Sequence, residues 1–200
     1  MENNEYEIKV EGTPNTFEGG AIRYNKSKGR FDLIPMEVYM ELIKIIPNIS
    51  WDNKTLEQDI KKVHESLCLT TRDRFIRAIL YITILVYGPD IWDSLPVMMC
   101  DLAIHFQKGA EKYGERNCEQ GIPLWSFIDS GTRHTMQFLV GKEDEKHHIS
   151  AIWNFWMAEW TCLKFERENG VKLEEVKNDC NFNAMLLKHT DSDNDEGGTA

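Results

Sequence analysis

The stretch that decides the fold is EKHHISAIWNFWMAEWTCLKFERE, residues 145–168. Its large apolar side chains cover nearly every face of a helix, and they include Trp153, Phe155, Trp156, Trp160 and Phe165. A helix that is apolar all round is usually buried by its neighbours. The stretch therefore predicts one long buried helix from about Glu145 to Glu168, which other helices must cover.

Helical patterns outside this segment predict those neighbours. Apolar residues recur at helical spacing over five segments, at residues 36–46, 53–68, 71–86, 94–113 and about 124–140. Gly88 and Gly114 follow two of these segments, as helix terminators do. Ser94 followed by Pro96 predicts a helix N-cap with proline in the first turn. No convincing strand alternation appears, so the predicted fold is all-α, a helical bundle.

The two ends of the chain differ in composition from the helical segments. Residues 1–34 are polar and rich in glycine, which predicts an extended N-terminal arm or loop. The chain ends in DSDNDEGGTA, residues 191–200, which predicts a disordered acidic tail. The predicted plan is an arm over 1–34, a helical domain over 35–170, and a short helix with the tail over 171–200.

Charge limits the partners of the protein. The 200 residues carry 33 acidic and 23 basic side chains, which gives a formal net charge of −10. That balance argues against wide contact with extended nucleic acid, because such contact needs a basic surface. A small anionic ligand needs only a local basic pocket, helped by a divalent metal ion.

Cysteine spacing and the first residues indicate a reduced, cytoplasmic protein. The cysteines at positions 68, 100, 118, 162 and 180 form no CxxC pair, so neither a zinc ribbon nor a disulfide framework is indicated. The stretch MENNEYEIKVEG lacks the basic and apolar regions of a signal peptide. The longest apolar run, near residues 78–88, is too short to span a bilayer, so no membrane partner is expected.

The stretch AEKYGERNCEQGIPLWSFIDSGTRHTMQFL, residues 110–139, crowds polar side chains around one turn. Gly109, Gly114 and Gly121 are expected to let the backbone turn sharply. The turn would then bring Lys112, Arg116 and Arg133 to one place, where cations suit a polyphosphate. Tyr113, Trp125 or Trp153 would stack a base. The alternative is a packed turn whose arginine and asparagine side chains cap the helix C-terminus.

A second pattern lies on the aromatic-rich helix. His147, Ala151, Asn154 and Ala158 are spaced by four, three and four residues, which places them on one stripe. The small alanines would leave room for a ligand to approach His147 and Asn154, so the stripe is a candidate site wall. The alternative is that His147 merely begins the helix and Asn154 bonds a backbone group in the core.

Four separated pieces of the chain resemble a known family. They are GGAIRYNKSKGRFDLIP at 19–35, KGAEKYGERNCEQGIP at 108–123, RH at 133–134 and HHISAIWN at 147–154. In this order they resemble the phage-type dATP/dGTP diphosphohydrolase N-terminal domain family. That family is similar to the MazG-like all-α pyrophosphohydrolases, which split a nucleoside triphosphate into monophosphate and pyrophosphate with a divalent metal. The resemblance makes residues 35–170 the nucleotide-handling domain.

The resemblance and the local patterns together assign candidate roles. The catalytic candidates are His134, His147 and Asn154. The substrate-binding candidates are Lys112, Tyr113, Arg116, Asn117 and Arg133. The candidate ligands of Mg²⁺ or Mn²⁺, a cofactor that the resemblance implies, are Asp32, Glu111, Glu115 and Asp144.

Acidic pairs give a weaker signal than the family pieces. The wider pyrophosphohydrolase group carries ExxE followed by ExxD on the next helix, which gathers carboxylates around Mg²⁺, and this signature is not present in the chain. Glu37 with Glu41 and Glu111 with Glu115 each lie one helical turn apart, so either pair could hold a metal. The alternative for each pair is a solvated acidic face.

The chain departs from the family pattern at three places. Cys118 stands where the family often has tryptophan. The connection GKEDEKHHIS, residues 141–150, is shortened, and Ser150 stands at the second histidine position. A helical insert at about 48–94 separates the first family piece from the others, and it could remodel the pocket or form an oligomer interface.

These observations leave three functional hypotheses. The first is a metal-dependent hydrolase that cleaves a purine (deoxy)nucleoside triphosphate to monophosphate and pyrophosphate. The second is a catalytically weakened phage protein that binds and sequesters a nucleotide or nucleotide-derived signal, which Ser150 favours. The third is an interaction protein that uses the Trp153, Trp156 and Trp160 set as a dimer seam. A homo-oligomer is expected, in the host cytoplasm if the chain is phage-encoded.

Overall fold

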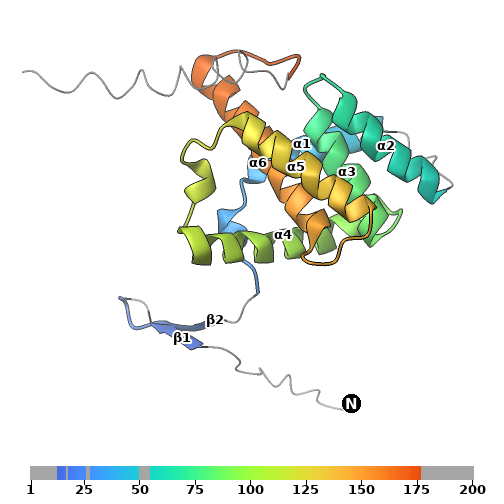
Figure 1. Ribbon diagram of the computed structural model, residues 1–200. Coiled ribbons are helices and arrows are strands. Elements are labelled where there is room, and N and C mark those ends of the chain that lie inside the picture. Colours follow the sequence, from blue (N-terminus) through green and yellow to red (C-terminus); the bar gives the residue numbers. More distant parts are fainter. Residues whose placement is uncertain (1–12, 17, 26–27, 50–54, 177–200) are drawn as a thin grey trace, which may run out of the picture.

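The computed structural model describes residues 13–16, 18–25, 28–49 and 55–176 (Figure 1). Its described helices are α1 Met36–Ile45, α2 Leu56–Cys68, α3 Arg74–Tyr87, α4 Ile91–Tyr113, α5 Leu124–Leu139 and α6 His147–Asn169. Three short 3-10 helices lie at Phe31–Leu33, Ile46–Asn48 and Asn117–Glu119. The predicted all-α helical bundle is confirmed, and each helix lies where the sequence pattern placed it, to within a few residues at its ends.

Helix α6 lies in the middle of the bundle. It contacts α1, α3, α4 and α5, and Figure 1 shows α5 running alongside it. Trp156 and Phe155 are almost fully buried, and the indole nitrogen of Trp156 donates to the carbonyl of Pro35 at 3.1 Å. The aromatic-rich segment is therefore the core helix that its composition predicts, and Trp156 also fixes the entry to α1.

Close packing of α5 on α6 depends on Gly131. A Cβ atom at this position would lie 2.7 Å from Cε1 of Phe155, whose ring is buried. Real side chains do not approach so closely, and crowding a packed core is destabilising. The missing side chain at Gly131 thus lets α5 and α6 come together, which sets the positions of the histidines that both helices carry.

Helix α3, which falls in the predicted insert at about 48–94, is part of the core. Its buried residues include Phe75, Ile79 and Leu80, and α3 packs against α6 on one side and α2 on another. Arg72, just before α3, forms ion pairs with Glu159 and Glu166 of α6. Removing residues 48–94 would therefore open the core, so this segment is part of the folded domain, and its role in an oligomer interface stays a prediction.

The N-terminal arm contains a hairpin that the sequence did not reveal. Strands β1 Thr13–Thr16 and β2 Ile22–Asn25 pair antiparallel, and Figure 1 shows them apart from the helices. Four residues are too few to display a clear alternation, which explains why no strand was predicted. After the hairpin, the arm contacts α4, because the amide of Arg30 donates to the carbonyl of Ala103 at 3.0 Å.

One local prediction differs from the structure. Helix α4 begins at Ile91 rather than at Ser94, because the Asp90 carboxylate caps it by accepting from the amides of Trp92 at 3.0 Å and Asp93 at 3.4 Å. Pro96 consequently lies inside the helix. Residues 171–176 are not helical, and residues 177–200, which hold the rest of the predicted short helix and disordered tail, lie outside the described residues. Within the described part of the chain, no single helix is long and apolar enough to cross a membrane.

Candidate functional site

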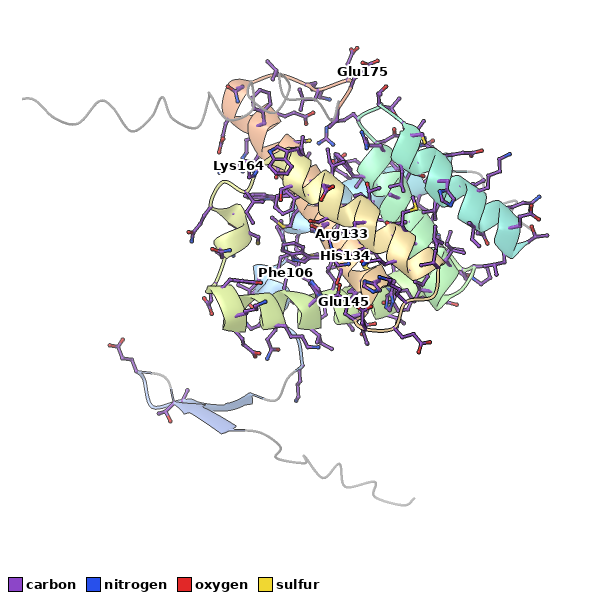
Figure 2. The ribbon with its side chains drawn as sticks, viewed as in Figure 1. Phe106, Arg133, His134, Glu145, Lys164 and Glu175 are labelled. Atoms are coloured by element: carbon purple, nitrogen blue, oxygen red, sulfur yellow. The ribbon has the colours of Figure 1, made fainter. Side chains whose placement is uncertain are left out.

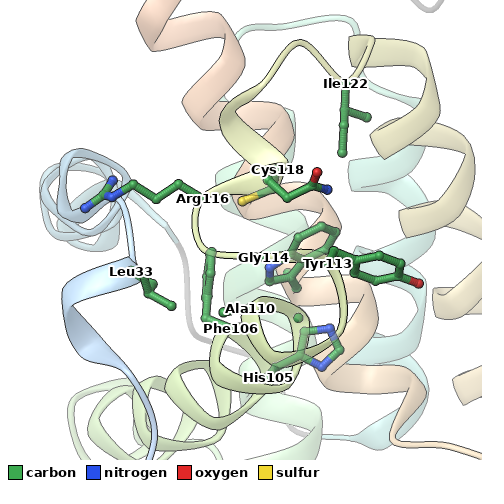
Figure 3. Close-up of a pocket in the computed structure, with 12 residues that line it drawn as sticks. Leu33, His105, Phe106, Ala110, Tyr113, Gly114, Arg116, Cys118 and Ile122 are labelled. Atoms are coloured by element: carbon green, nitrogen blue, oxygen red, sulfur yellow. The ribbon is translucent and has the colours of Figure 1, made fainter.

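An apolar cavity of about 330 Å³ lies at the C-terminal end of α4 (Figure 3). Its walls include Leu33 from the arm, Phe106 and Tyr113 from α4, Asn117 from the following turn, and Trp153 from α6. This volume is at the lower end of the range for small-molecule sites, which are mostly apolar with a few polar groups. Three of the candidate substrate residues, Tyr113, Arg116 and Asn117, thus line this cavity.

Arg116 lies at the edge of this apolar cavity in an unusual backbone conformation. It is the one described non-glycine residue with positive φ, at 55°. Its guanidinium donates to the carbonyl of Asp32 at 3.1 Å and to the carboxylate of Glu119 at 2.7 Å. Strained backbone persists where the surroundings fix it and often occurs at ligand sites. The turn therefore presents the Arg116 side chain, which is 56% exposed, beside the cavity.

The other two candidate cations lie elsewhere. Lys112 is exposed, with its ammonium 4.7 Å from the centre of the Tyr113 ring. Arg133 is exposed on α5 and donates to the Ser130 hydroxyl at 3.2 Å. Lys112 and Arg133 do not line the apolar cavity, so Arg116 alone of the three cations predicted to converge lies beside it, and the substrate roles of the other two stay predictions. Gly109, one of the predicted turn glycines, lies within α4 and lines the cavity instead.

Three of the candidate metal carboxylates are engaged by other side chains. Arg30 donates to Asp32 at 2.7 Å and to Glu115 at 2.8 Å, and this hydrogen bonding lowers the pKa of Asp32. Glu111 accepts from the amide of Gln107 at 2.9 Å. The guanidinium of Arg30 therefore takes the place that a cation would fill between Asp32 and Glu115. Their role as metal ligands stays a prediction.

A second cavity, of about 260 Å³, lies nearer the start of α6, and we call it the polar cavity because six of its eight lining residues are polar or charged. Its walls include Asp101 and Lys108 from α4 and Glu145, Lys146 and Ser150 around the start of α6, and His105 lines both this cavity and the apolar one. Lys146 lies 3.8 Å from Asp101. The polar cavity therefore gathers charges of both signs beside the apolar one, as a ligand with an aromatic part and a charged part requires.

The fourth candidate carboxylate, Asp144, belongs to a histidine cluster formed by His134, Asp144, Glu145 and His147. The two Nδ1 atoms of His134 and His147 are 3.1 Å apart. Glu145 Oε1 lies 3.0 Å from the first and 3.2 Å from the second. On its other side, His147 Nε2 lies 2.7 Å from Asp144. The three atoms of His134, Glu145 and His147 are near enough to one another to hold one metal ion.

The cluster results from the hairpin of two helices. His134 lies near the C-terminal end of α5, and His147 is the first residue of α6. Figure 2 shows His134 on α5 above Glu145, which precedes α6. His147 is buried, whereas Glu145 is 49% exposed and also lines the polar cavity. Burial lowers the pKa of His134, which favours its neutral imidazole. The cluster therefore sits at the boundary between core and polar cavity.

Asn154, the third catalytic candidate, lies apart from the cluster. Its amide is buried and donates to the carbonyl of Ser150 at 2.8 Å. Ala151 and Ala158 on the same stripe are fully buried. Asn154 lines neither the apolar nor the polar cavity, so its observed contact is the backbone bond considered as the alternative for this residue.

Sequence reasoning missed three basic residues of the two cavities and one member of the cluster. They are His105, Lys108, Lys146 and Glu145. Glu145 could have been suspected because it stands two residues before His147. His105 and Lys108 carried no signal of their own, because only packing decides which face of α4 turns toward α6. Cys118, the departure noted beside the RN piece, lines the apolar cavity, and burial raises the pKa of its thiol to about 11.

Comparison with known protein families matches part of the chain. Residues 87–170 match the family described as dATP/dGTP diphosphohydrolase, N-terminal. The resemblance predicted from the sequence is thereby confirmed for this segment, which carries α4, α5 and α6. The segment holds the histidine cluster, the polar cavity and the walls of the apolar cavity other than Leu33. A search of curated proteins and a search of solved structures each found no match.

His105 predicts a measurable dependence of stability on pH. Burial lowers its pKa from 6.5 to about 4, while nearby Glu145 acts in the opposite direction. Between these pH values the unfolded chain binds a proton that the folded protein does not, so the free energy of unfolding falls as pH falls. The loss reaches at most about 3 kcal/mol. In metal-free protein, we expect urea unfolding of His105→Gln to lose less stability than wild type between pH 7 and pH 4.

Acid also protonates carboxylates, and it does so in both proteins. The difference between their losses of unfolding free energy therefore reports the contribution of His105. Equal losses of stability in His105→Gln and wild type would contradict the expectation.

Proposed function

We propose that the protein is a metal-dependent hydrolase that cleaves a purine (deoxy)nucleoside triphosphate to monophosphate and pyrophosphate. The observation that carries the proposal is the adjacency of the apolar and polar cavities, which share His105. An aromatic base and a charged polyphosphate need two such environments side by side. The family match over residues 87–170 supports the same reading, because its description names this activity.

The apolar cavity suits a purine base. Trp153 contacts the rings of Phe106 and Phe127 edge-on, with ring centres 6.0 Å and 5.9 Å apart, so these aromatic side chains are held in place by packing. A base stacked on an aromatic side chain gains about 1–3 kcal/mol. The amide of Asn117 can both donate to and accept from the edge of a base. We therefore assign the base to this cavity and its recognition to Asn117.

The polar cavity suits the phosphates. Lys108 and Lys146 offer positive charge there, while Asp101 and Glu145 on the same walls would repel a polyphosphate. A divalent metal ion, which the family resemblance implies, would offset that repulsion and polarise the phosphoryl group. Hydrolysis then joins the oxygen of a water molecule to the α-phosphorus, breaks the bond from that phosphorus to the α–β bridging oxygen, and releases pyrophosphate. His105, neutral through burial, can accept a hydrogen bond from that water.

The direct test is product formation. The protein is incubated with each dNTP and Mg²⁺ or Mn²⁺, and monophosphate is measured by chromatography while binding is measured in parallel. Monophosphate and pyrophosphate from a purine dNTP are the expected products. Absence of product with every dNTP would overturn the proposal, and tight binding without product would select a protein that sequesters a nucleotide instead.

Arg116→Ala is expected to weaken nucleotide binding by ten- to a hundred-fold. The reason is loss of a charge-assisted hydrogen bond at the edge of the apolar cavity, which typically contributes about 1.5–3 kcal/mol. Calorimetric titration with a purine dNTP measures the change. Arg167→Ala removes an exposed arginine of α6 that pairs with Glu37, and it serves as the control with unchanged affinity. Arg133→Ala tests the predicted role of Arg133 in substrate binding, although this residue does not line the apolar cavity. Weaker nucleotide binding by this variant would support that role.

Equal affinities of Arg116→Ala and Arg167→Ala would exclude Arg116 from the nucleotide site, provided both variants keep the helical circular dichroism of wild type.

Ser150 supports a second candidate, a protein that binds and sequesters a nucleotide with weakened turnover. Ser150 lines the polar cavity beside Glu145, at the position where the family pattern has a second histidine. A hydroxyl is a poorer ligand for transition metals than a neutral imidazole. If turnover is weakened for this reason, Ser150→His should raise turnover or its dependence on metal, measured as monophosphate released per minute. Wild-type turnover of about 1 per second or faster that is slowed by Ser150→His would refute the hypothesis of weakened turnover.

A further inference from the structure

We infer that His134, Glu145 and His147 bind one divalent transition-metal ion through the two Nδ1 atoms and one carboxylate oxygen, before any nucleotide is present. The inference concerns metal binding alone, and it holds whether or not the protein hydrolyses nucleotides. Its ligands differ from those of the Mg²⁺ or Mn²⁺ site predicted at Asp32, Glu111, Glu115 and Asp144.

The first argument is the spacing of the three atoms. They lie 3.1 Å, 3.0 Å and 3.2 Å apart, so they form a nearly regular triangle. Metal–ligand bonds of about 2.0–2.2 Å at angles between octahedral and tetrahedral values place neighbouring ligand atoms roughly 2.8–3.6 Å apart. The separations in the cluster are thus those of ligands on one face of a coordination sphere, and the remaining positions stay open to water or a phosphate.

The second argument is the orientation of His147. Its Nε2 lies 2.7 Å from the Asp144 carboxylate. When Nε2–H donates to Asp144, the lone pair of the neutral ring is on Nδ1, which faces His134 and Glu145. Histidine ligands of metal ions commonly donate their other ring nitrogen to a carboxylate in this way. Asp144 is therefore a positioning residue for the ligand His147 rather than a ligand itself.

The third argument is hydrogen bonding without a metal. With His147 in that tautomer, the N–H at Nδ1 of His134 can donate to both His147 Nδ1 and Glu145 Oε1. No hydrogen atom is then left between His147 Nδ1 and Glu145 Oε1, so a nitrogen lone pair faces a carboxylate oxygen at 3.2 Å. A cation within the triangle removes this conflict. The competing arrangement is an imidazolium at His147 that donates to Asp144 and Glu145 together, and it leaves no place for a metal.

The chemistry of the ligands selects the class of metal. Two imidazole nitrogens and one carboxylate suit Zn²⁺, Co²⁺, Mn²⁺ or Fe²⁺, whereas Mg²⁺ prefers oxygen ligands only. Access is available because Glu145 is 49% exposed and lines the polar cavity. A metal ion held here would lie at the edge of the cavity to which we assign the phosphates.

The test uses full-length protein stripped with EDTA and titrated with Co²⁺ or Zn²⁺ in the absence of nucleotide. Calorimetry gives stoichiometry and affinity, and the visible absorption of Co²⁺ reports nitrogen ligation and coordination number. We expect one ion per chain. Glu145→Gln and His134→Gln should each weaken binding by at least a hundred-fold, and Asp144→Asn by 10–100-fold. The matched control is Glu143→Gln, an exposed carboxylate of the same connection, with affinity unchanged.

Two results would overturn the inference. One is the lack of saturable Co²⁺ and Zn²⁺ binding by wild type, as the imidazolium arrangement requires. The other is wild-type affinity in Glu145→Gln, which decides the matter even if His134→Gln fails to fold, because Glu145 is half exposed. Nucleotide hydrolysis is assayed separately with Mg²⁺ on the same variants. Turnover without transition-metal binding refutes the metal site and supports the hydrolase. Metal binding without turnover supports the metal site and refutes the hydrolase.

Discussion

Trp156→Ala is expected to lower the free energy of unfolding by about 3–5 kcal/mol, the range for removing a fully buried aromatic side chain. The Trp156 indole is 0% exposed on α6 and is hydrogen-bonded to the carbonyl of Pro35. Its removal leaves a cavity where several helices meet, and it also leaves that carbonyl without its partner. Urea unfolding followed by circular dichroism measures the loss.

The control for this prediction is Trp92→Ala. Trp92 is 55% exposed on α4, and a surface substitution of this kind changes stability by within about 0.5 kcal/mol. Similar losses in the two variants would contradict the central place of α6. The dimer-seam hypothesis has a related criterion, because a seam requires Trp153, Trp156 and Trp160 to be exposed. Trp156 and Trp160 are buried, and Trp153 lines the apolar cavity, so that criterion is not met.

Arg72→Met is the second substitution with a large expected effect, a loss of about 3–5 kcal/mol at pH 8. Arg72 pairs with the buried Glu159 and with Glu166, which ties the start of α3 to α6. Without the guanidinium, Glu159 must either stay charged in the core or take up a proton. Breaking a buried pair is costly for that reason, whereas replacing both partners is tolerated far better.

The pH dependence of this loss has a definite sign. Burial raises the pKa of Glu159, and Arg72 opposes that effect, so the pKa rises further in Arg72→Met. A folded state that binds the extra proton loses stability as pH rises. We therefore expect the destabilisation to be smaller at pH 5 than at pH 8, as measured by urea unfolding at both values.

Two further variants make the Arg72 result specific. The double variant Arg72→Met with Glu159→Gln should recover a large part of the lost stability, because no buried charge is then left alone. Arg77→Met removes a partly exposed pair with Asp73 in the same segment, and it should cost no more than about 1 kcal/mol. A pH-independent loss in Arg72→Met, or no recovery in the double variant, would show that the ion pair is not the cause.

Local patterns in the sequence were enough to place the helices. Helical periodicity, the glycines after helices and the apolar surround of residues 145–168 are properties of neighbouring residues, so they can be read without the fold. The boundary at Ser94 was wrong because two capping signals lie four residues apart, and only the structure shows that Asp90 is used. The family resemblance, also local in its pieces, is confirmed for residues 87–170.

The site depended on contacts that periodicity cannot supply. Arg116 and Arg133 are both cations near one turn in sequence, yet the rotation of α5 turns Arg133 to the surface while Arg116 stays at the apolar cavity. Arg30 lies 85 residues from Glu115, and their ion pair exists only because the arm docks on α4. Such pairings depend on how whole helices pack, so no short stretch of sequence encodes them.

The histidine cluster shows the same division. The sequence alone determined that His134 lies near the end of one helix and His147 at the start of the next. The 3.1 Å between their Nδ1 atoms was decided by the close packing of α5 on α6, which Gly131 permits beside the ring of Phe155. A helix can rotate about its axis without changing its periodic pattern, and a rotation of one residue moves a side chain by about 100°. Packing in the core fixes that rotation, and it thereby converts two separate histidines and Glu145 into one group of ligand atoms.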